Sequence, residues 1–155
     1  MPIGSLVLQG VLLDGSGMNR EVHVPFCERL LGRFRRSTHL SIIGLGWLGW
    51  PLAKQLAASG YHVRGSVTSM TKKQQLATEK PEIDVQCWQA DEQAELPDSL
   101  FAPLMIITIP PGKLSRYFEA LQSLVLQARQ HGVQHLIYIS STSVYGGTGR
   151  CDETL

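Results

Sequence analysis

The stretch that decides the fold is "GLGWLG", Gly44 to Gly49. It matches the pattern G-x-G-x-x-G, and a short apolar run, "LSII" over 40–43, comes directly before it. An amphipathic stretch over 47–59 follows, with leucines four residues apart, which is typical of a helix with one buried face. The motif therefore stands between a strand and a helix. This context carries the interpretation, since the letters alone often match by chance.

Each glycine of the motif has a physical role in a phosphate-binding turn. Gly44 permits the tight turn, Gly46 leaves the backbone open to a pyrophosphate, and Gly49 lets the helix pack closely on the strand. Trp47 and Leu48 lie where the helix begins and offers free N–H groups and a partial positive charge to phosphates. The alternative is a glycine-rich turn without a ligand. The strand–turn–helix context favours a dinucleotide site formed by Gly44, Gly46, Trp47, Leu48 and Gly49.

The rest of the chain continues the alternation of strand and helix. Apolar runs predict strands over 61–67, 85–90, 104–109 and 135–140, and helices are predicted over 71–80 and from 117 to about 131. Strands that are apolar throughout and separated by helices indicate a parallel sheet covered on both faces. Right-handed crossovers then give an α/β fold, a Rossmann-type doubly wound sheet of about five strands. The last helix is expected to bury the stripe Tyr117, Phe118, Leu121, Leu124, Val125 and Ala128.

Composition and charge limit the kind of partner. The 155 residues leave room for one domain, and the formal net charge of +1 gives no field that favours nucleic acid or a membrane. Cys27, Cys87 and Cys151 are too few and too scattered for a disulfide framework or a zinc site. No secretory signal is recognisable. We therefore expect a cytoplasmic protein with reduced thiols and no bound metal.

The first 39 residues precede the strand on which such domains usually open. The stretch over 5–17 suggests a hairpin or two short edge strands, and the stretch over 27–39 a short basic amphipathic helix. Four arginines there are more typical of a solvated face than of a nucleic-acid patch. We therefore divide the chain into an N-terminal extension of unclear structure (1–39) and a dinucleotide-binding domain (40–155).

The end of the second predicted strand distinguishes the two nicotinamide dinucleotides. An NAD site usually has an acidic residue there, which accepts hydrogen bonds from the ribose. Here no acidic residue occurs between Gly49 and Glu79, and the strand is followed by Thr68, Ser69 and Lys72. Hydroxyl and ammonium groups can hold a 2′-phosphate, so NADP(H) is favoured over NAD(H) as cofactor. Alternatively, the lysine belongs to an exposed helix and contacts no ligand.

Three further residues stand where later strands end. Asp91 could reach the adenine amino group, or could cap the next helix as a solvated turn residue. Ile109 and Pro110 end the strand over 104–109, where the carboxyl edge of the sheet would face the ribose on the nicotinamide side. The alternative is that the proline only shapes the turn.

The two segments "GLGWLGWPLAKQLAASGYHVRGSV" and "HLIYISSTSVYG" together resemble the extended and atypical branches of the short-chain dehydrogenase/reductase superfamily, the nucleotide-sugar epimerases, dehydratases and reductases. The resemblance covers residues 40 to about 149. It implies an NAD(P)-dependent oxidoreductase or epimerase that transfers a hydride to or from a small-molecule substrate, for example a nucleotide sugar. It also implies that Ser141 is the catalytic serine, whose hydroxyl contacts the reacting oxygen. The alternative is that Ser141 only lines the turn.

The same resemblance implies a Tyr-x-x-x-Lys pair beyond the serine, and this pair does not occur in the chain. The last lysine is Lys113, before the serine. We therefore expect the N-terminal, cofactor-binding portion of a longer enzyme, C-terminally truncated relative to the family and not catalytically competent alone. The alternatives are a dinucleotide-binding regulator or redox sensor, and a sheet that serves only for protein association. An uncovered last strand would favour a homodimer or aggregation, unless the N-terminal extension covers it.

Overall fold

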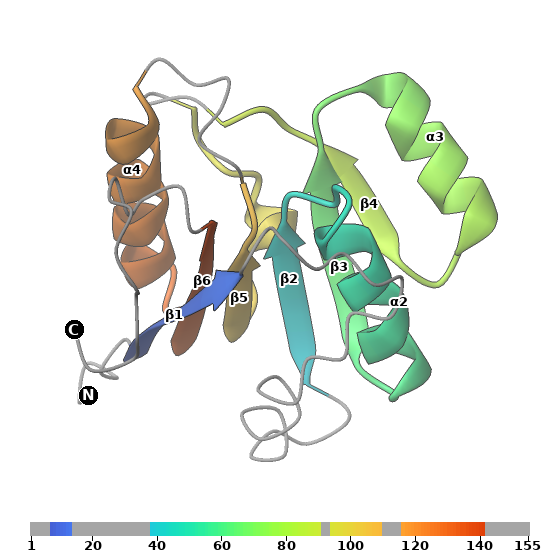
Figure 1. The fold of residues 1–155 in the computed structure, drawn as a ribbon, viewed down its shortest axis with the longest axis horizontal. Helices are drawn as coiled ribbons and strands as arrows, with labels where there is room; N and C mark the ends of the chain where they lie inside the picture. Colours follow the sequence, from blue (N-terminus) through green and yellow to red (C-terminus); the bar gives the residue numbers. More distant parts are fainter. Residues whose placement is uncertain (1–6, 14–37, 91–93, 110–115, 142–155) are drawn as a thin grey trace.

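One parallel sheet organises the chain. The structure, a computed structural model, describes residues 7–13, 38–90, 94–109 and 116–141. Six strands pair in the order β1-β6-β5-β2-β3-β4 (Figure 1). The strands are β1 (Val7–Leu13), β2 (His39–Ile43), β3 (His62–Val67), β4 (Asp84–Cys87), β5 (Leu104–Ile107) and β6 (His135–Ser141). The helices are α2 (Gly49–Ala58), α3 (Met70–Glu79), the 3₁₀ turn η1 (Asp98–Leu100) and α4 (Tyr117–Gln130). All the strands predicted after residue 39 are present, which confirms the Rossmann-type α/β fold.

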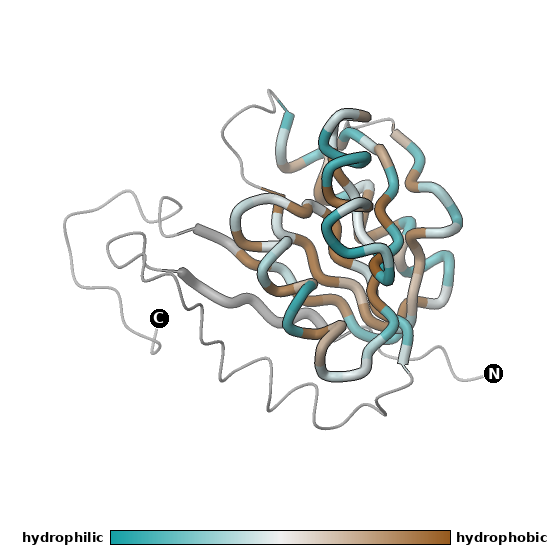
Figure 2. The backbone as a smooth tube through the Cα atoms, turned by 90° about the vertical axis from the view of Figure 1, so that its right-hand side faces the viewer, coloured by the Kyte–Doolittle hydropathy of each residue, from teal (hydrophilic) through white to brown (hydrophobic). Residues whose placement is uncertain are grey.

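Side chains that alternate along the strands divide the core into two layers. Leu40 and Ile42 of β2 pack with α2 and α3 on one face, whereas Ile43 packs with α4 and the segment around η1 on the other. Figure 1 shows α2 and α3 on one side of the sheet and α4 on the other. In Figure 2 the brown, hydrophobic segments lie mainly inside the molecule and the teal, hydrophilic segments mainly at its periphery. The sheet is therefore covered on both faces, as the apolar strands predict.

Helix α4 confirms its predicted position and corrects one of its predicted contacts. Leu124 and Ala128 are buried, and Leu121 packs against the same core layer. Phe118 is 74% exposed, so its assignment to the buried stripe is wrong. One residue turns an α-helix by about 100°, so a helix that faces Tyr117 and Leu121 toward the sheet directs Phe118 outward.

The N-terminal strand β1 pairs with β6, from Val7 opposite His135 to Leu13 opposite Ser141. Sequence patterns suggest a hairpin or two edge strands over 5–17, and in the part of this region that the structure describes, residues 7–13, one strand joins the parallel sheet. The free edge of β6, on which the expectation of a homodimer rested, is therefore paired. A homodimer stays a prediction without that support.

The amino ends of β2 and β3 carry a cluster of two histidines and an arginine. His39 and His62 stack with ring centroids 4.8 Å apart, and Arg64 approaches Nδ1 of His39 at 3.1 Å through Nη2. Because a guanidinium can only donate, Nδ1 accepts, and His39 is held as the neutral Nε2–H tautomer. Burial, followed by the charges of Arg64 and His62, lowers the pKa of His39 below 6.5.

This cluster predicts a loss of stability in mild acid. Because the pKa of His39 is lowered by folding, the unfolded chain binds more protons, and stability falls as pH drops through 6.5. The measurement is the urea midpoint from pH 7.5 to 5.5 in the parent and in His39→Gln. Glutamine keeps an acceptor but does not titrate, so the variant should show a smaller decline. Equal declines would exclude His39 as the cause.

Candidate functional site

The glycine motif lies where the sheet changes direction. From β2 the chain proceeds through β3 and β4 to one edge, and β5 then lies on the opposite side of β2. The loops after β2 and β5 lead into α2 and α4, which cover opposite faces (Figure 1). In doubly wound sheets this switch point opens a crevice at the carboxyl ends of the strands, and ligands bind there.

Two of the three motif glycines are required by close contacts within the protein. Gly44 has a φ of 109°, a conformation that side chains disfavour, and an added Cβ would lie 2.8 Å from Oγ1 of Thr108. An added Cβ on Gly49 would lie 2.0 Å from the Gly44 carbonyl oxygen. Gly46 differs, because an added Cβ would meet no atom of the described residues within 4 Å. Gly44 and Gly49 therefore close the turn, and no described residue occupies the space over Gly46.

Two hydroxyl side chains that sequence reasoning missed hold this turn in place. The amide of Gly44 donates to Oγ of Ser66 at 3.0 Å, and the amide of Leu45 donates to the Ser66 carbonyl at 2.7 Å. Thr108 donates from Oγ1 to the Gly44 carbonyl, and from its amide to the Ile43 carbonyl at 3.0 Å. Ser66 is buried in β3 and Thr108 follows β5. The loop is thus fastened to the strands on both of its sides.

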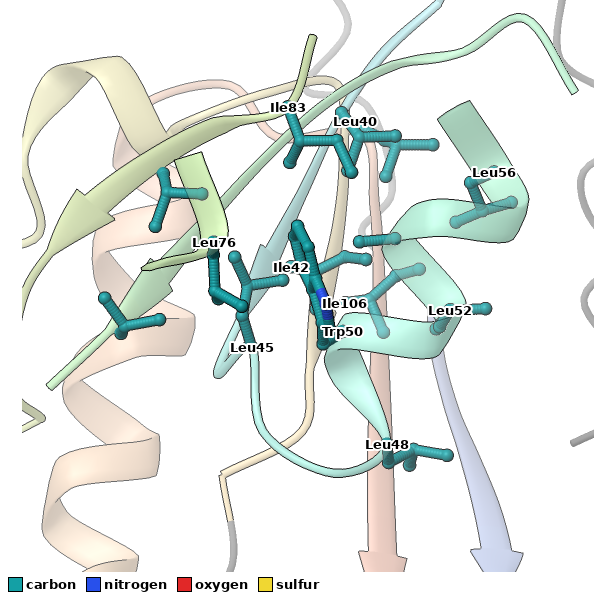
Figure 3. Close-up of a cluster of buried hydrophobic side chains, with 14 of the residues drawn as sticks. Leu40, Ile42, Leu45, Leu48, Trp50, Leu52, Leu56, Leu76, Ile83 and Ile106 are labelled. Carbon is teal, nitrogen blue, oxygen red and sulfur yellow. The ribbon is translucent and has the colours of Figure 1, made fainter. Parts of the chain in front are cut away.

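Apolar side chains of the same loop anchor it in the hydrophobic core. Leu45 and Leu48 are buried in the core layer that contains Trp50 of α2 and Leu76 of α3. In Figure 3 Leu45 extends from the loop toward Trp50 and Leu76, and Leu48 lies at the start of α2. Leu45 fits only because residue 65 of β3 is glycine, as an added Cβ there would lie 2.7 Å from Cγ of Leu45. Gly65 is a third residue that sequence reasoning missed, although a glycine inside a strand often marks such an approach.

Replacing Gly65 with alanine is expected to reduce the free energy of unfolding by about 1–3 kcal/mol. The new Cβ would meet Leu45, and also the Ile42 carbonyl at 2.8 Å, so the loop has to shift. The measurement is urea unfolding of Gly65→Ala, Leu45→Ala and the double variant. Leu45→Ala removes the clashing atoms, so the double variant should be more stable than the sum of the single losses predicts. Strict additivity would contradict this packing.

The N-terminus of α2 lies in the same turn as the motif glycines. Leu48 is the N-cap residue and makes no capping hydrogen bond through its side chain, and no acidic residue occurs in the first turn. Helix N-termini carry unpaired N–H groups and a partial positive charge, which favour phosphate. Trp47, beside Gly46, is 62% exposed. The predicted residues Gly44, Gly46, Trp47, Leu48 and Gly49 therefore lie together in one turn.

The residues predicted to select the dinucleotide follow β3. Thr68 and Lys72 are exposed, and Ser69 is the N-cap of α3, with Oγ accepting from the Lys72 amide at 3.2 Å. Within the described residues Lys72 forms no ion pair. The Ser69 hydroxyl is thus engaged in the cap of α3, whereas the side chains of Thr68 and Lys72 are exposed.

The remaining predicted residues are described to different extents. Ile109 lies beside the motif, with its amide 3.5 Å from where a Cβ of Gly44 would be. Of Ser141 the structure describes the backbone, as the last residue of β6. Asp91 and Pro110 lie outside the described residues. In the described part of the chain no group of three His, Cys, Asp or Glu residues could hold a metal, and no helix there is long and apolar enough to cross a membrane.

Comparisons with known proteins give one relative in sequence and several in structure. Over 117 residues the chain is 36% identical to Protein YeeZ of Escherichia coli, in strain K12 and in O157:H7. The match covers 69% of this chain and 42% of YeeZ, so the chain spans less than half the length of the curated relatives it matches. No family model matches the chain.

Two solved structures share its architecture. Yeast methylglyoxal/isovaleraldehyde reductase Gre2, complexed with NADPH, has a TM-score of 0.56 at 13% identity, over 64% of this chain and 36% of that chain. Gre2 of Candida albicans, also complexed with NADPH, has a TM-score of 0.54 at 15% identity, over 65% and 36%. At such identities the similarity is one of fold. The chain thus shares the Rossmann-type α/β fold of these NADPH complexes.

Proposed function

We propose that the chain is the dinucleotide-binding part of an oxidoreductase or epimerase of the short-chain dehydrogenase/reductase superfamily, and that its cofactor is NADP(H). The observation that carries this proposal is the contrast among the motif glycines. Gly44 and Gly49 are required by contacts at 2.8 and 2.0 Å, whereas no described residue comes within 4 Å of a Cβ added at Gly46. The fold alone explains the first two glycines. A pyrophosphate that approaches the backbone at Gly46 would explain the third.

The preference for NADP(H) rests on charges at the start of α3. Lys72 and Lys73 occupy its first turn, which contains no acidic residue. Positive side chains are unfavourable near a helix N-terminus, because the helix dipole is positive there. A 2′-phosphate bound beside Thr68 and Ser69 would bring negative charge to this N-terminus. Its charge would attract both the lysines and the positive end of the helix dipole, and the arrangement would become favourable. The NADPH in both Gre2 complexes is consistent with this preference.

The catalytic role is assigned to Ser141, at the carboxyl end of β6. The switch point would place the nicotinamide between β5 and β6, within reach of that strand end. The superfamily's Tyr-x-x-x-Lys pair is not in this sequence, so hydride transfer by these 155 residues alone is not expected. The second candidate function is a dinucleotide-binding regulator, which would not need that pair. A small-molecule substrate, such as a nucleotide sugar, belongs to the first.

Titration of the purified chain with NADPH and NADH, followed by nicotinamide fluorescence, tests the proposal. We expect saturable binding of NADPH and weaker binding of NADH. If neither dinucleotide binds, the proposed function is wrong. Because turnover by these 155 residues is not expected under either candidate function, its absence does not separate them, whereas turnover of an oxidisable or reducible substrate would favour the enzymatic function over the regulatory one.

Lys72→Ala is expected to weaken NADPH binding by about 3- to 10-fold, because it removes one charge from an exposed phosphate contact. NADH binding should not change, because NADH has no 2′-phosphate. The measurement is the ratio of the two dissociation constants. Lys80→Ala is the matched control, since Lys80 ends the same helix and pairs with Glu82. An equal loss for NADPH and NADH would contradict this role of Lys72.

A further inference from the structure

Two tyrosines form a hydrogen-bonded chain next to the glycine motif. The hydroxyl of Tyr117, the first residue of α4, lies 2.7 Å from the Ile109 carbonyl and 2.7 Å from the hydroxyl of Tyr138 in β6. A phenol has one proton, and a carbonyl can only accept. Tyr117 therefore donates to Ile109, and Tyr138 donates to Tyr117. The two hydrogen bonds therefore point the same way, from Tyr138 in β6 to Tyr117 in α4 and from Tyr117 to the Ile109 carbonyl after β5.

The peptide bond between Ile109 and Pro110 offers one polar group, its carbonyl, for attachment. Residue 110 is proline, which lacks an N–H, so the Ile109 carbonyl is the only hydrogen-bonding group of the peptide bond between them. Burial, followed by the hydrogen bond and proximity to Tyr138, raises the pKa of Tyr117. Its hydroxyl therefore keeps its proton at neutral pH and remains a donor.

The held peptide lies at the candidate site. The amide nitrogen and Cγ1 of Ile109 are each 3.5 Å from where a Cβ of Gly44 would be. Tyr138 is close to the carboxyl end of the sheet, since its register partner is Ile107, the last residue of β5. The tyrosines thus lie on the β5–β6 side of the switch point. Thr68 and Lys72, which follow β3, lie on the other side.

We propose that Tyr117 and Tyr138 are positioning residues that hold the Ile109 peptide beside the glycine motif and so determine the affinity for the nicotinamide half of the dinucleotide. This inference rests on the proposed function. It assigns to the β5–β6 side a role separate from that of Lys72, because the adenosine half of NADPH would bind on the β3 side. Loss of a tyrosine hydroxyl should therefore affect one half of the cofactor and spare the other.

The test compares two ligands, NADPH and 2′,5′-ADP, which is the adenosine half of NADPH with its 2′-phosphate. In Tyr117→Phe the dissociation constant for NADPH should rise by about 3- to 10-fold, as expected for the loss of one ordinary hydrogen bond. The constant for 2′,5′-ADP should stay within about 2-fold. Tyr138→Phe should have a smaller effect in the same direction, and the double variant should equal Tyr117→Phe, since Tyr138 acts through Tyr117.

Tyr61→Phe is the matched control, because it removes the same hydroxyl at the opposite end of the sheet, before β3. Its ratio of NADPH to 2′,5′-ADP affinity should equal that of the parent. An equal loss of both ligands in Tyr117→Phe and Tyr138→Phe, or no loss of either, would overturn the inference. If the parent binds neither ligand, the proposed function itself fails. Tyr138→Phe also provides the test if Tyr117→Phe does not fold.

Discussion

Replacing Gly49 with alanine is expected to lower the free energy of unfolding by about 3 kcal/mol or more. The new methyl group would lie 2.0 Å from the Gly44 carbonyl oxygen and 3.1 Å from Oγ1 of Thr108. The first of these neighbours is backbone, so the start of α2 would have to move away from β2. In a domain of this size the melting temperature should fall by roughly 10 °C. Thermal and urea unfolding of the variant measure the effect.

Gly46→Ala is the control for this prediction, since it is the same substitution three residues earlier in the same turn. An added Cβ there meets nothing within 4 Å, and Gly46 is not among the glycines with positive φ. Its stability should therefore stay within about 0.5 kcal/mol of the parent. A small loss in Gly49→Ala, similar to that in Gly46→Ala, would contradict the close packing of helix on strand.

Replacing Gly46 with valine is expected to abolish dinucleotide binding and to leave the fold intact. The isopropyl group would occupy the open space over the backbone, where we place the pyrophosphate. Blocking even two charge-assisted hydrogen bonds from backbone N–H groups costs about 3–6 kcal/mol, which is about 100-fold or more in affinity. The dissociation constant for NADPH measures the effect, and the melting temperature verifies the fold.

Gly132→Val is a useful comparison for Gly46→Val. Gly132 also has open space around it but has a φ of 72° and follows α4, at the opposite edge of the sheet from the motif. Valine there should reduce stability, because it disfavours positive φ, but it should not reduce NADPH affinity. If Gly46→Val bound NADPH as tightly as the parent, the interpretation of the glycine motif would be wrong.

The sequence predicted the fold and the turn at the glycine motif because both depend on local patterns. Apolar runs and the spacing of the glycines are visible within some twenty residues, and the turn at Gly44 to Gly49 forms as they indicate. The ends of two helices are also marked locally, by a glycine. Gly60 and Gly132, which follow α2 and α4, both have positive φ.

Contacts between distant segments could not be predicted in this way. Ser66 and Thr108 hold the Gly44 turn from two other strands, and neither hydroxyl differs in sequence from an ordinary strand residue. β1 pairs with the last described strand, so its partner is far along the chain. Gly10 and the Asp, Gly and Ser residues that follow Leu13 in the sequence are residue types that favour turns, and they suggested a hairpin in this segment. The exposure of Phe118 depends on how α4 is rotated about its axis relative to the sheet. A stripe of six apolar residues does not determine that rotation.

The most direct test of the central claim, that the turn from Gly44 to Gly49 binds a nicotinamide dinucleotide, is a titration of the ¹⁵N-labelled chain with NADPH followed by ¹H–¹⁵N correlation spectra. The account predicts saturable shifts of the amide signals of Gly44 to Gly49 and of Ile109. Gly132 and Val133, at the opposite edge of the sheet, should keep their positions. Saturating NADPH that leaves the Gly44 to Gly49 signals unchanged, or that shifts only signals elsewhere, would contradict the account.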